Sequence, residues 1–290
     1  TSPSLTARLM VLLSARPRKA TLMPCRGATS LAMYSMSDCS AALPSLVATT
    51  RVAPAISLAD LVSPKKMNFT ATAALAADAA TAKPPLGLPP VPIPADNPQT
   101  PEKVALGKKL FDDKRFSSTG EVSCATCHDP AKAFTDSPLK TSEGINKLTG
   151  TRNAPTVVNA AYFASQFWDG RSADLEDQSQ HPFINPVEMG LADHQPILKI
   201  VRSDPSYVDM FRKSFGIEPD AITMDHVKMA IASFERTIVA GDSPFDRWYF
   251  GGEKTAMSES AIRGFEVFLG DGRCVSCHTI EQDHALFTDN

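Results

Sequence analysis

Apolar positions recur along most of the chain at the three-to-four-residue spacing of amphipathic helices. One such segment opens at Thr100, a helix-capping residue that Pro101 follows. Its apolar face consists of Val104, Gly107 and Phe111. Alternating apolar and polar residues, which would indicate β-strands, are nearly absent from the sequence. The pattern therefore predicts a mainly α-helical protein.

A second segment repeats this design. Ser258 can cap a helix whose inner face holds Ile262, Gly264 and Phe268, so that Gly-X-X-X-Phe occurs in both segments. In each copy the glycine would allow another helix to approach closely. The repeat indicates a duplicated unit, and coincidence between two ordinary helices is the alternative.

Two further helices are predicted between these segments. The first begins at Asp204 and Pro205 and ends at Gly216, a residue type that often closes a helix. The second carries a longer apolar stripe and extends to Gly241. Their inward-facing residues are Tyr207, Phe211 and Phe215 in the first, and Val227, Ile231, Phe234 and Ile238 in the second.

A Cys-X-X-Cys-His motif follows each glycine-containing segment. The two motifs are Cys124-Ala125-Thr126-Cys127-His128 and Cys274-Val275-Ser276-Cys277-His278. Two cysteines at this spacing lie on one side of a helical turn, where they can form thioether bonds with one haem, and the histidine then faces the iron. The sequence therefore predicts two covalently bound c-type haems.

Two other interpretations of these cysteines account for fewer features of the sequence. A zinc site with four thiolate ligands would not account for a histidine at the same offset in both copies. A thioredoxin-like redox pair would be preceded by a strand-helix-strand pattern, which neither motif has.

Length and composition exclude several classes of protein. A chain of 290 residues suggests about two domains, and 43% hydrophobic residues is ordinary for a globular protein. The net charge of −3 and the lack of a basic, aromatic-rich stretch exclude nucleic acid as an expected partner. No apolar run reaches the roughly 18 residues that a membrane-spanning helix needs.

Residues 1–95 are expected to lie outside the folded domains. We interpret residues 1–70 as a disordered leader from a mis-assigned start, and Cys25 and Cys39 within it are not expected to form a framework disulfide. Ala74-Leu75-Ala76 has the form of a signal-peptide cleavage site, which together with covalent haem attachment predicts a periplasmic protein. Eight prolines among the nineteen residues Lys83–Pro101 predict a linker, or a strap on a domain surface.

Five short segments resemble, in order and spacing, the bacterial di-haem cytochrome c peroxidases and their MauG-like relatives. They are Leu106-Gly107-Lys108-Lys109-Leu110-Phe111, the first haem motif with Asp129-Pro130, Arg152-Asn153-Ala154-Pro155-Thr156, Phe167-Trp168-Asp169-Gly170-Arg171, and Glu188-Met189. The resemblance implies two class-I cytochrome c-like domains. Residues 96–245 would hold the peroxidatic haem, and residues 246–290 would begin a truncated electron-transfer domain, with the second haem's distal ligand expected beyond residue 290.

The resemblance also implies roles for individual residues. His128 would bind the peroxidatic iron and His278 the electron-transfer iron. Glu188 matches the distal glutamate that moves protons between peroxide oxygens, a task that a carboxylate beside the iron can perform. Gln178 matches a distal residue that orients peroxide, and Trp168 matches a tryptophan between the two haems.

Two further assignments leave alternatives open. Arg171 would hold a haem propionate through paired hydrogen bonds or form a surface salt bridge. Asn153 resembles the side-chain ligand of a calcium ion between the domains, so a calcium site is a hypothesis that the resemblance adds.

The loop Glu143–Lys147 contains no histidine, whereas many family members have one there that binds the first iron in the oxidised enzyme. We therefore expect this haem to keep an open position and to need no reductive activation. The nearest other histidines, His181 and His194, are expected to be exposed or structural.

These features favour a peroxidase that reduces hydrogen peroxide to water with electrons from a small cytochrome c or a cupredoxin. A MauG-like oxidase of a protein or organic substrate is the enzymatic alternative, and a di-haem electron carrier is the non-enzymatic one. The expected open iron site argues against the carrier but does not separate the two enzymes. Many family members are dimers, so a homodimer is also expected.

Overall fold

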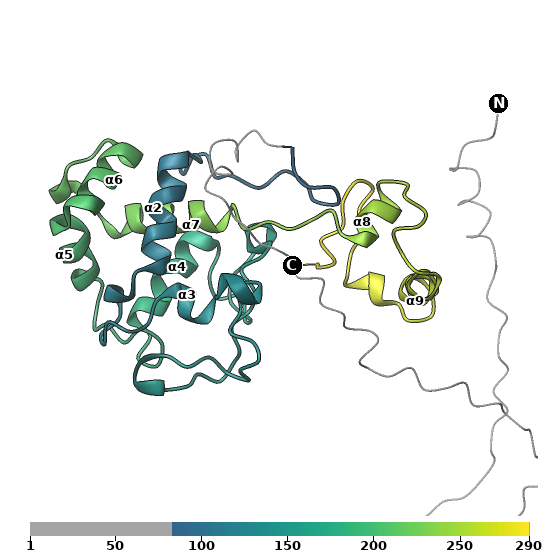
Figure 1. The fold of residues 1–290 in the computed structure, drawn as a ribbon, viewed down its shortest axis with the longest axis horizontal. Coiled ribbons are helices and arrows are strands. Elements are labelled where there is room, and N and C mark those ends of the chain that lie inside the picture. Colours follow the sequence, from purple (N-terminus) through teal and green to yellow (C-terminus); the bar gives the residue numbers. More distant parts are fainter. Residues whose placement is uncertain (1–82, 290) are drawn as a thin grey trace, which may run out of the picture. The chain divides into compact units, whose positions relative to one another are not determined.

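A computed structural model describes residues 83–289 of the protein (Figure 1). Within that range the regular elements are helices, and extended residues pair only at isolated bridges. The predicted mainly α-helical fold is confirmed. No helix of the described range is long and apolar enough to cross a membrane. Cys25, Cys39 and the predicted cleavage site Ala74-Leu75-Ala76 lie outside the described residues.

We call residues 100–241 the N-terminal haem unit and residues 243–289 the C-terminal haem unit. The α-helices of the first are α2 (Pro101–Asp112), α3 (Cys124–Cys127), α4 (Leu175–Ile184), α5 (Gln195–Ser203), α6 (Pro205–Phe215) and α7 (Met224–Glu235), and those of the second are α8 (Pro244–Tyr249) and α9 (Glu259–Leu269). Short 3-10 helices connect them at Lys114–Phe116, Pro130–Lys132, Ile145–Lys147, Ala160–Tyr162, Pro219–Ala221 and Cys274–Ser276.

Three predicted helix starts are confirmed by the hydrogen bonds of their caps. The Thr100 hydroxyl accepts a bond from the Lys103 amide at 3.2 Å at the start of α2. Asp204 caps α6 in the same way, and Ser258 caps α9. Each side chain pairs a backbone donor that the first helical turn would otherwise leave free.

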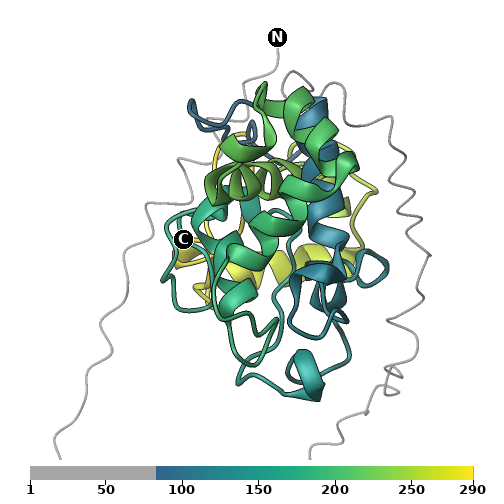
Figure 2. The ribbon, with the colours of Figure 1, turned by 90° about the vertical axis from the view of Figure 1, so that its left-hand side faces the viewer.

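Gly107 is the point at which α2 meets α7. A Cβ atom there would overlap the backbone carbonyl of Ala230 and the Cβ of Phe234. The predicted close helix approach is therefore confirmed in the N-terminal haem unit. Figures 1 and 2 show α2 beside α7 and α6, which it contacts along its length.

The end of α7 differs from the sequence prediction, which extended the helix to Gly241. The helix ends at Glu235, and the next residues leave the helical path. Ile238 is buried outside the helix, where its carbonyl accepts a bond from the Asn159 amide at 2.9 Å. Thr237, Ile238 and Val239 are β-branched, which lowers their helix propensity, and the bond to Asn159 satisfies an extended backbone.

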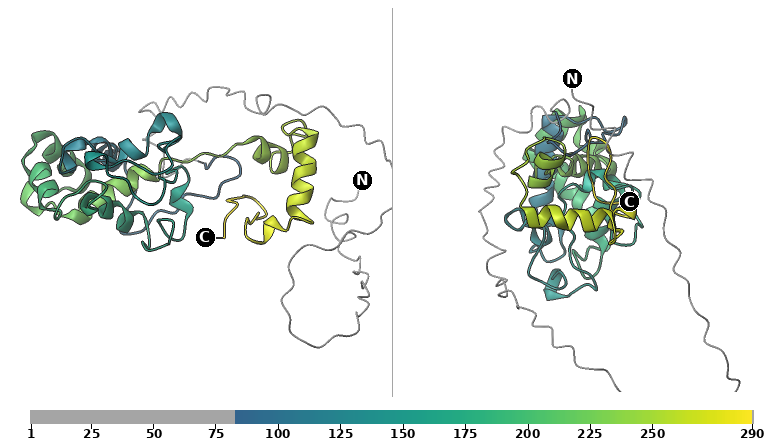
Figure 3. Two further views of the ribbon diagram at one scale, coloured as in Figure 1. Left: turned by 90° about the horizontal axis from the view of Figure 1, so that it is seen from below. Right: turned by 90° about the vertical axis from the view of Figure 1, so that its right-hand side faces the viewer.

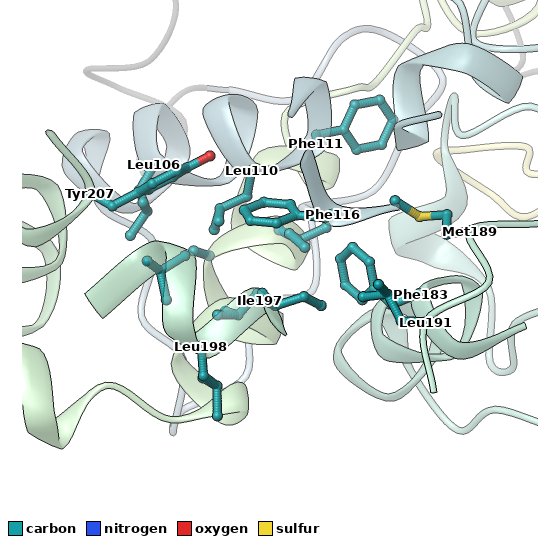
Figure 4. Packing of buried hydrophobic residues seen from close by; sticks show 14 of the residues in the cluster. Leu106, Leu110, Phe111, Phe116, Phe183, Met189, Leu191, Ile197, Leu198 and Tyr207 are labelled. Carbon is teal, nitrogen blue, oxygen red and sulfur yellow. The ribbon is translucent and has the colours of Figure 1, made fainter. Parts of the chain in front are cut away.

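A continuous apolar core joins α2 to the helices α4–α7 (Figure 4). Tyr207 is fully buried in it, and its hydroxyl donates to the Asp113 carboxylate at 2.8 Å. The members with the largest fully buried side chains are Leu106, Leu110, Phe111, Phe116, Phe183, Ile197, Val201, Tyr207, Phe211, Ile222, Val227 and Ile231.

An ion pair ties α4 to the end of α7. Both oxygens of Glu176 accept bonds at 2.7 Å from Arg236, which is 5% exposed. Asn97 donates a third bond to Glu176 at 2.7 Å. Burial opposes ionisation of Glu176, but the bonds from Arg236 and Asn97 outweigh it and lower the pKa of the carboxyl. The guanidinium of Arg236 therefore directs two hydrogen bonds to Glu176.

The C-terminal haem unit is held together mainly by aromatic rings. Phe245 contacts the rings of Tyr249 at 5.2 Å and Phe265 at 5.3 Å, and Trp248 packs on Phe265 at 5.5 Å. Figure 3 shows α9 as a straight helix ahead of the second haem motif. Gly264 on this helix has open space around its Cα, unlike Gly107.

The proline-rich segment contacts both haem units. In the first, the Tyr162 hydroxyl donates to the carbonyl of Pro89 at 3.0 Å. In the second, the Ala285 amide donates to the carbonyl of Gly87 at 3.0 Å. The segment is thus a strap rather than a free linker, whereas the predicted domain limits at 95/96 and 245/246 remain predictions.

Candidate active site

The two haem motifs share one backbone hydrogen bond, although the first is an α-helical turn and the second a 3-10 turn. In α3 the amide of Ser123 donates to the Thr126 hydroxyl at 2.9 Å, which closes the turn that carries Cys124 and Cys127. The His128 amide donates to the Cys124 carbonyl at 2.9 Å, and the His278 amide donates to the Cys274 carbonyl at the same distance. Each motif therefore brings two cysteines and the following histidine together on one turn.

Hydrogen bonds orient both histidine rings. The Nδ1 atom of His128 lies 3.2 Å from the carbonyl oxygen of Phe134, and Nδ1 of His278 lies 2.7 Å from that of Phe287. Because a carbonyl only accepts, Nδ1 carries the proton and Nε2 is left to bind a metal. Burial lowers the pKa of His128, which favours the neutral ring that metal binding requires.

The two motifs also share an aromatic neighbour. The Phe111 ring lies 6.4 Å from the His128 ring, and the Phe268 ring lies 6.2 Å from the His278 ring, both with planes tilted by 45°. The Gly-X-X-X-Phe repeat of the sequence therefore corresponds to a structural repeat.

A cavity of about 450 Å³ opens beside the first motif. Cys124, Cys127 and His128 form one part of its wall, and Phe111 and Ile231 give it apolar surface. Apolar walls beside two thiols and one neutral histidine suit an attached porphyrin, so the residues fit the predicted haem. The cavity also brings together the remaining residues predicted for this site, namely Glu188, Gln178, Trp168, Arg171 and Asn153.

Glu188 is held in a tight turn at the cavity. Its Oε1 atom accepts a bond from the Asn185 side chain at 2.7 Å, and its carbonyl accepts one from the Ile145 amide at 2.9 Å. Burial raises the pKa of the Glu188 carboxyl, and the charge of Arg171 partly opposes this rise. Burial raises the pKa of Cys127 to about 11, and the negative charges of Asp136 and Glu188 add to this rise.

Gln178 lies on α4, one turn after the cap that Asp174 provides. Trp168 lies at the mouth of the cavity, where 59% of its surface is exposed and its indole nitrogen donates to the Asn153 carbonyl at 3.0 Å. Asn153 is exposed beside Trp168, and its backbone carbonyl accepts the hydrogen bond from the indole nitrogen.

Arg171 is a rim residue with two contacts. It donates to Asp169 at 2.7 Å, and its guanidinium lies 3.4 Å from the centre of the Phe167 ring. The surface salt bridge is therefore observed, and the side chain still lines the cavity. Its propionate role remains a prediction.

The loop Glu143–Lys147 forms a small hairpin beside the Glu188 turn. Asn146 and Lys147 have φ values of 52° and 58°, as a two-residue hairpin turn requires, and the Leu148 amide donates to the Ile145 carbonyl at 2.9 Å. Ile145 is buried against Gly190.

No second histidine lines the cavity within the described residues. His194 lies 3.1 Å from the Gln180 carbonyl, and His181 lies 3.5 Å from Asp177. The expectation that these two histidines are structural or exposed therefore agrees with their contacts.

The second motif is more open than the first. Cys274 and Cys277 are exposed, whereas Cys124 and Cys127 are partly buried. His278 is also exposed, and its Nδ1 atom keeps the contact with the Phe287 carbonyl that orients the ring.

Glu235 is a cavity residue that sequence reasoning missed. It lies at the end of α7, is 6% exposed and lines the cavity with Phe111 and Ile231. A signal was present in the sequence, because a carboxylate four residues after Ile231 falls on the inward stripe of the predicted helix.

The chain is similar to several known proteins. A family model described as di-haem cytochrome c peroxidase matches residues 101–255. Methylamine utilization protein MauG of Methylorubrum extorquens is 43% identical over 189 residues, which cover 65% of this chain and 52% of that protein. Cytochrome c551 peroxidase of Nitrosomonas europaea is 42% identical over 187 residues, which cover 64% of this chain and 54% of that protein.

A solved structure is also similar. The crystal structure of a MauG-like protein associated with microbial copper homeostasis superposes with a TM-score of 0.62 at 31% identity, and the match covers 70% of this chain and 59% of that one. The chain spans about half the length of the curated relatives it matches.

Proposed function

Because the chain belongs to the di-haem cytochrome c peroxidase family, we propose that it reduces hydrogen peroxide at the N-terminal haem unit with electrons from a small redox protein. The family carries two c-type haems, and this chain has both attachment motifs. The observation that carries the proposal is the presence of the half-buried Glu188 carboxyl in the same cavity as His128.

Peroxide reduction takes up two electrons and two protons and releases two molecules of water. A haem bound here would supply a metal that polarises the peroxide bond and takes part in electron transfer. Glu188 would take a proton from one peroxide oxygen and return it to the other, which leaves as water when the bond between the oxygens breaks, and the two electrons and two further protons convert the remaining oxygen to the second water. The Asn185 side chain fixes one carboxylate oxygen, so the other is available for this transfer.

Gln178 and Trp168 have supporting roles in the proposal. The amide of Gln178 can donate to one peroxide oxygen and accept from the other, which orients the substrate. Trp168, at the cavity mouth, would provide an aromatic path for electrons that arrive from the second haem. Arg171 would hold a haem propionate, and a calcium ion would bind near Asn153.

The alternative is a MauG-like oxidation of a protein or organic substrate. The lack of histidine in the hairpin Glu143–Lys147, which is anchored by backbone bonds to the Glu188 turn, is compatible with both enzymes and argues only against an electron carrier. The proposed electron donor is a small cytochrome c or cupredoxin, the proposed location is the periplasm, and the proposed assembly is a homodimer.

Steady-state turnover separates these functions. The haem-loaded protein is mixed with hydrogen peroxide and a reduced small cytochrome c, and oxidation of the cytochrome is followed by absorbance. The peroxidase proposal predicts two cytochromes oxidised per peroxide consumed. Oxidation of an added organic substrate without cytochrome turnover would favour the alternative, and slow one-electron exchange without peroxide loss would indicate a carrier.

The position of Arg171 predicts the pH dependence of this activity. Glu188 must be ionised to accept a proton, so kcat/KM for peroxide rises as pH rises through its elevated pKa. Arg171→Gln removes a charge that lowers this pKa, and the acid limb of the pH profile should move to higher pH. Arg152→Gln is the control, because Arg152 lines the same cavity and pairs with the same Asp169. Equal shifts in the two variants would contradict the assignment.

A further inference from the structure

Glu235 is a buried carboxyl group that the proposed reaction does not use. One of its oxygens, Oε2, is fully buried and has no hydrogen-bond partner. A buried polar atom in this state costs free energy unless a bound group or a proton compensates it. Within the described residues the side chain belongs to the wall of the haem cavity, together with Phe111 and Ile231.

The charged groups around Glu235 do not neutralise it. Arg236 is adjacent in sequence, but its guanidinium bonds both oxygens of Glu176 on α4. Glu176 adds a second negative charge on that side. On the cavity side the facing group is Cys124 of α3, and Asp112 at the end of α2 acts on the same thiol.

The carboxyl also lies close to the place where a haem is attached. Burial raises the pKa of the Cys124 thiol, and the negative charge of Glu235 is the next largest cause. Cys124 and Glu235 line the same cavity, so a porphyrin bonded to Cys124 would share this cavity with the Glu235 carboxyl. Phe111 and Ile231, which line the same cavity, are apolar and can offer the carboxyl neither a hydrogen bond nor a compensating charge.

We propose that Glu235 is a functional carboxyl of the N-terminal haem unit that binds a proton when the haem beside it accepts an electron. An ionised carboxylate opposes the addition of negative charge to a neighbouring haem, and a neutral carboxyl does not. One electron enters the haem and one proton enters Glu235, so the charge of the pair is unchanged. The inference depends on the haem of the proposed function but not on peroxide as the substrate.

The protonation behaviour of Glu235 is compatible with this role. Burial raises its pKa to about 8, although Arg236 opposes the rise and Glu176 adds to it. The Glu235 carboxyl therefore gains or loses its proton near neutral pH. At such pH values a change in the charge of the haem can shift the protonation of Glu235.

The test is a redox titration of both haems in the haem-loaded protein, followed by visible absorbance at a series of pH values around 8. One haem should show a midpoint potential that falls as pH rises, approaching a tenfold change in the reduction equilibrium per pH unit. In Glu235→Gln this dependence should be lost, and the potential should stay at the wild-type low-pH value. The other haem is an internal control, and Glu121→Gln, which removes an exposed carboxyl near α3, is the matched control.

Infrared difference spectra between reduced and oxidised protein provide a second readout. Reduction should produce the signal of a protonated carboxyl in the wild type, and Glu235→Gln should lack it. A wild-type potential independent of pH for both haems, or an unchanged dependence in Glu235→Gln, would overturn the inference. If the Glu235→Gln variant does not bind haem, the wild-type protein still provides a test. The pH dependence of its potentials and its infrared difference spectrum show whether a carboxyl group takes up a proton on reduction.

The redox titration and the peroxide assay test the two proposals independently. The titration uses neither peroxide nor a donor protein, so the absence of peroxidase turnover would leave a measured proton coupling intact. Conversely, full turnover with no coupling would reject the role of Glu235 alone.

Discussion

Glu188→Gln is expected to lower kcat/KM for hydrogen peroxide by about 10²–10⁴-fold, the range for loss of a general acid-base group. Glutamine has the same shape and can still accept the 2.7 Å bond from Asn185, so the turn should keep its geometry. It cannot accept and return a proton at this position. The measurement is steady-state peroxide consumption with a reduced small cytochrome, together with visible spectra of both haems.

Spectra of both haems should match the wild type in this variant. Glu143→Gln is the control, because Glu143 is an exposed carboxylate of the adjacent hairpin and is not part of the proposed chemistry. Retention of more than about one tenth of the wild-type kcat/KM by Glu188→Gln would show that another group moves the proton.

Gly107→Ala is expected to reduce the free energy of unfolding by about 3 kcal/mol, because the added Cβ overlaps the rigid backbone carbonyl of Ala230. The α2–α7 contact would have to open along its length. For a folded region of this size the change corresponds to a drop of roughly 10 °C in Tm, which thermal unfolding followed by circular dichroism can detect.

The repeat in the chain supplies a matched control for this substitution. Gly264 is the glycine of the second Gly-X-X-X-Phe sequence, and a Cβ there meets open space. Gly264→Ala should therefore stabilise α9 by about 0.5–1 kcal/mol through helix propensity. Equal effects of the two substitutions would mean that the helix crossing at Gly107 contributes little.

Helix starts could be predicted from the sequence because their signals are local. Thr100, Asp204 and Ser258 each cap a helix through a bond to an amide two or three residues away. The end of α7 could not be predicted, because it depends on Asn159, which lies far away in the chain. The helix α4 was missed since Pro182 lies inside it and weakens its helical pattern.

The chemistry of the candidate site could be predicted from the sequence, but the arrangement of its residues around one cavity could not. The two motifs indicate thioether attachment, and the resemblance supplied Glu188, Gln178 and Trp168. That these residues line one cavity follows only from the fold. Glu235 was overlooked because the apolar stripe was assigned to Phe234 and Ile238, whereas the structure places Glu235 inward and leaves Phe234 partly exposed.

The strap described above gives the chain two connections between its haem units. One is covalent, through residues 236–243, and the other is the pairing of Gly87 with His284 and Ala285. The backbone bonds of Gly87 therefore close a ring of chain that runs from the strap through the first haem motif to the residues after the second motif.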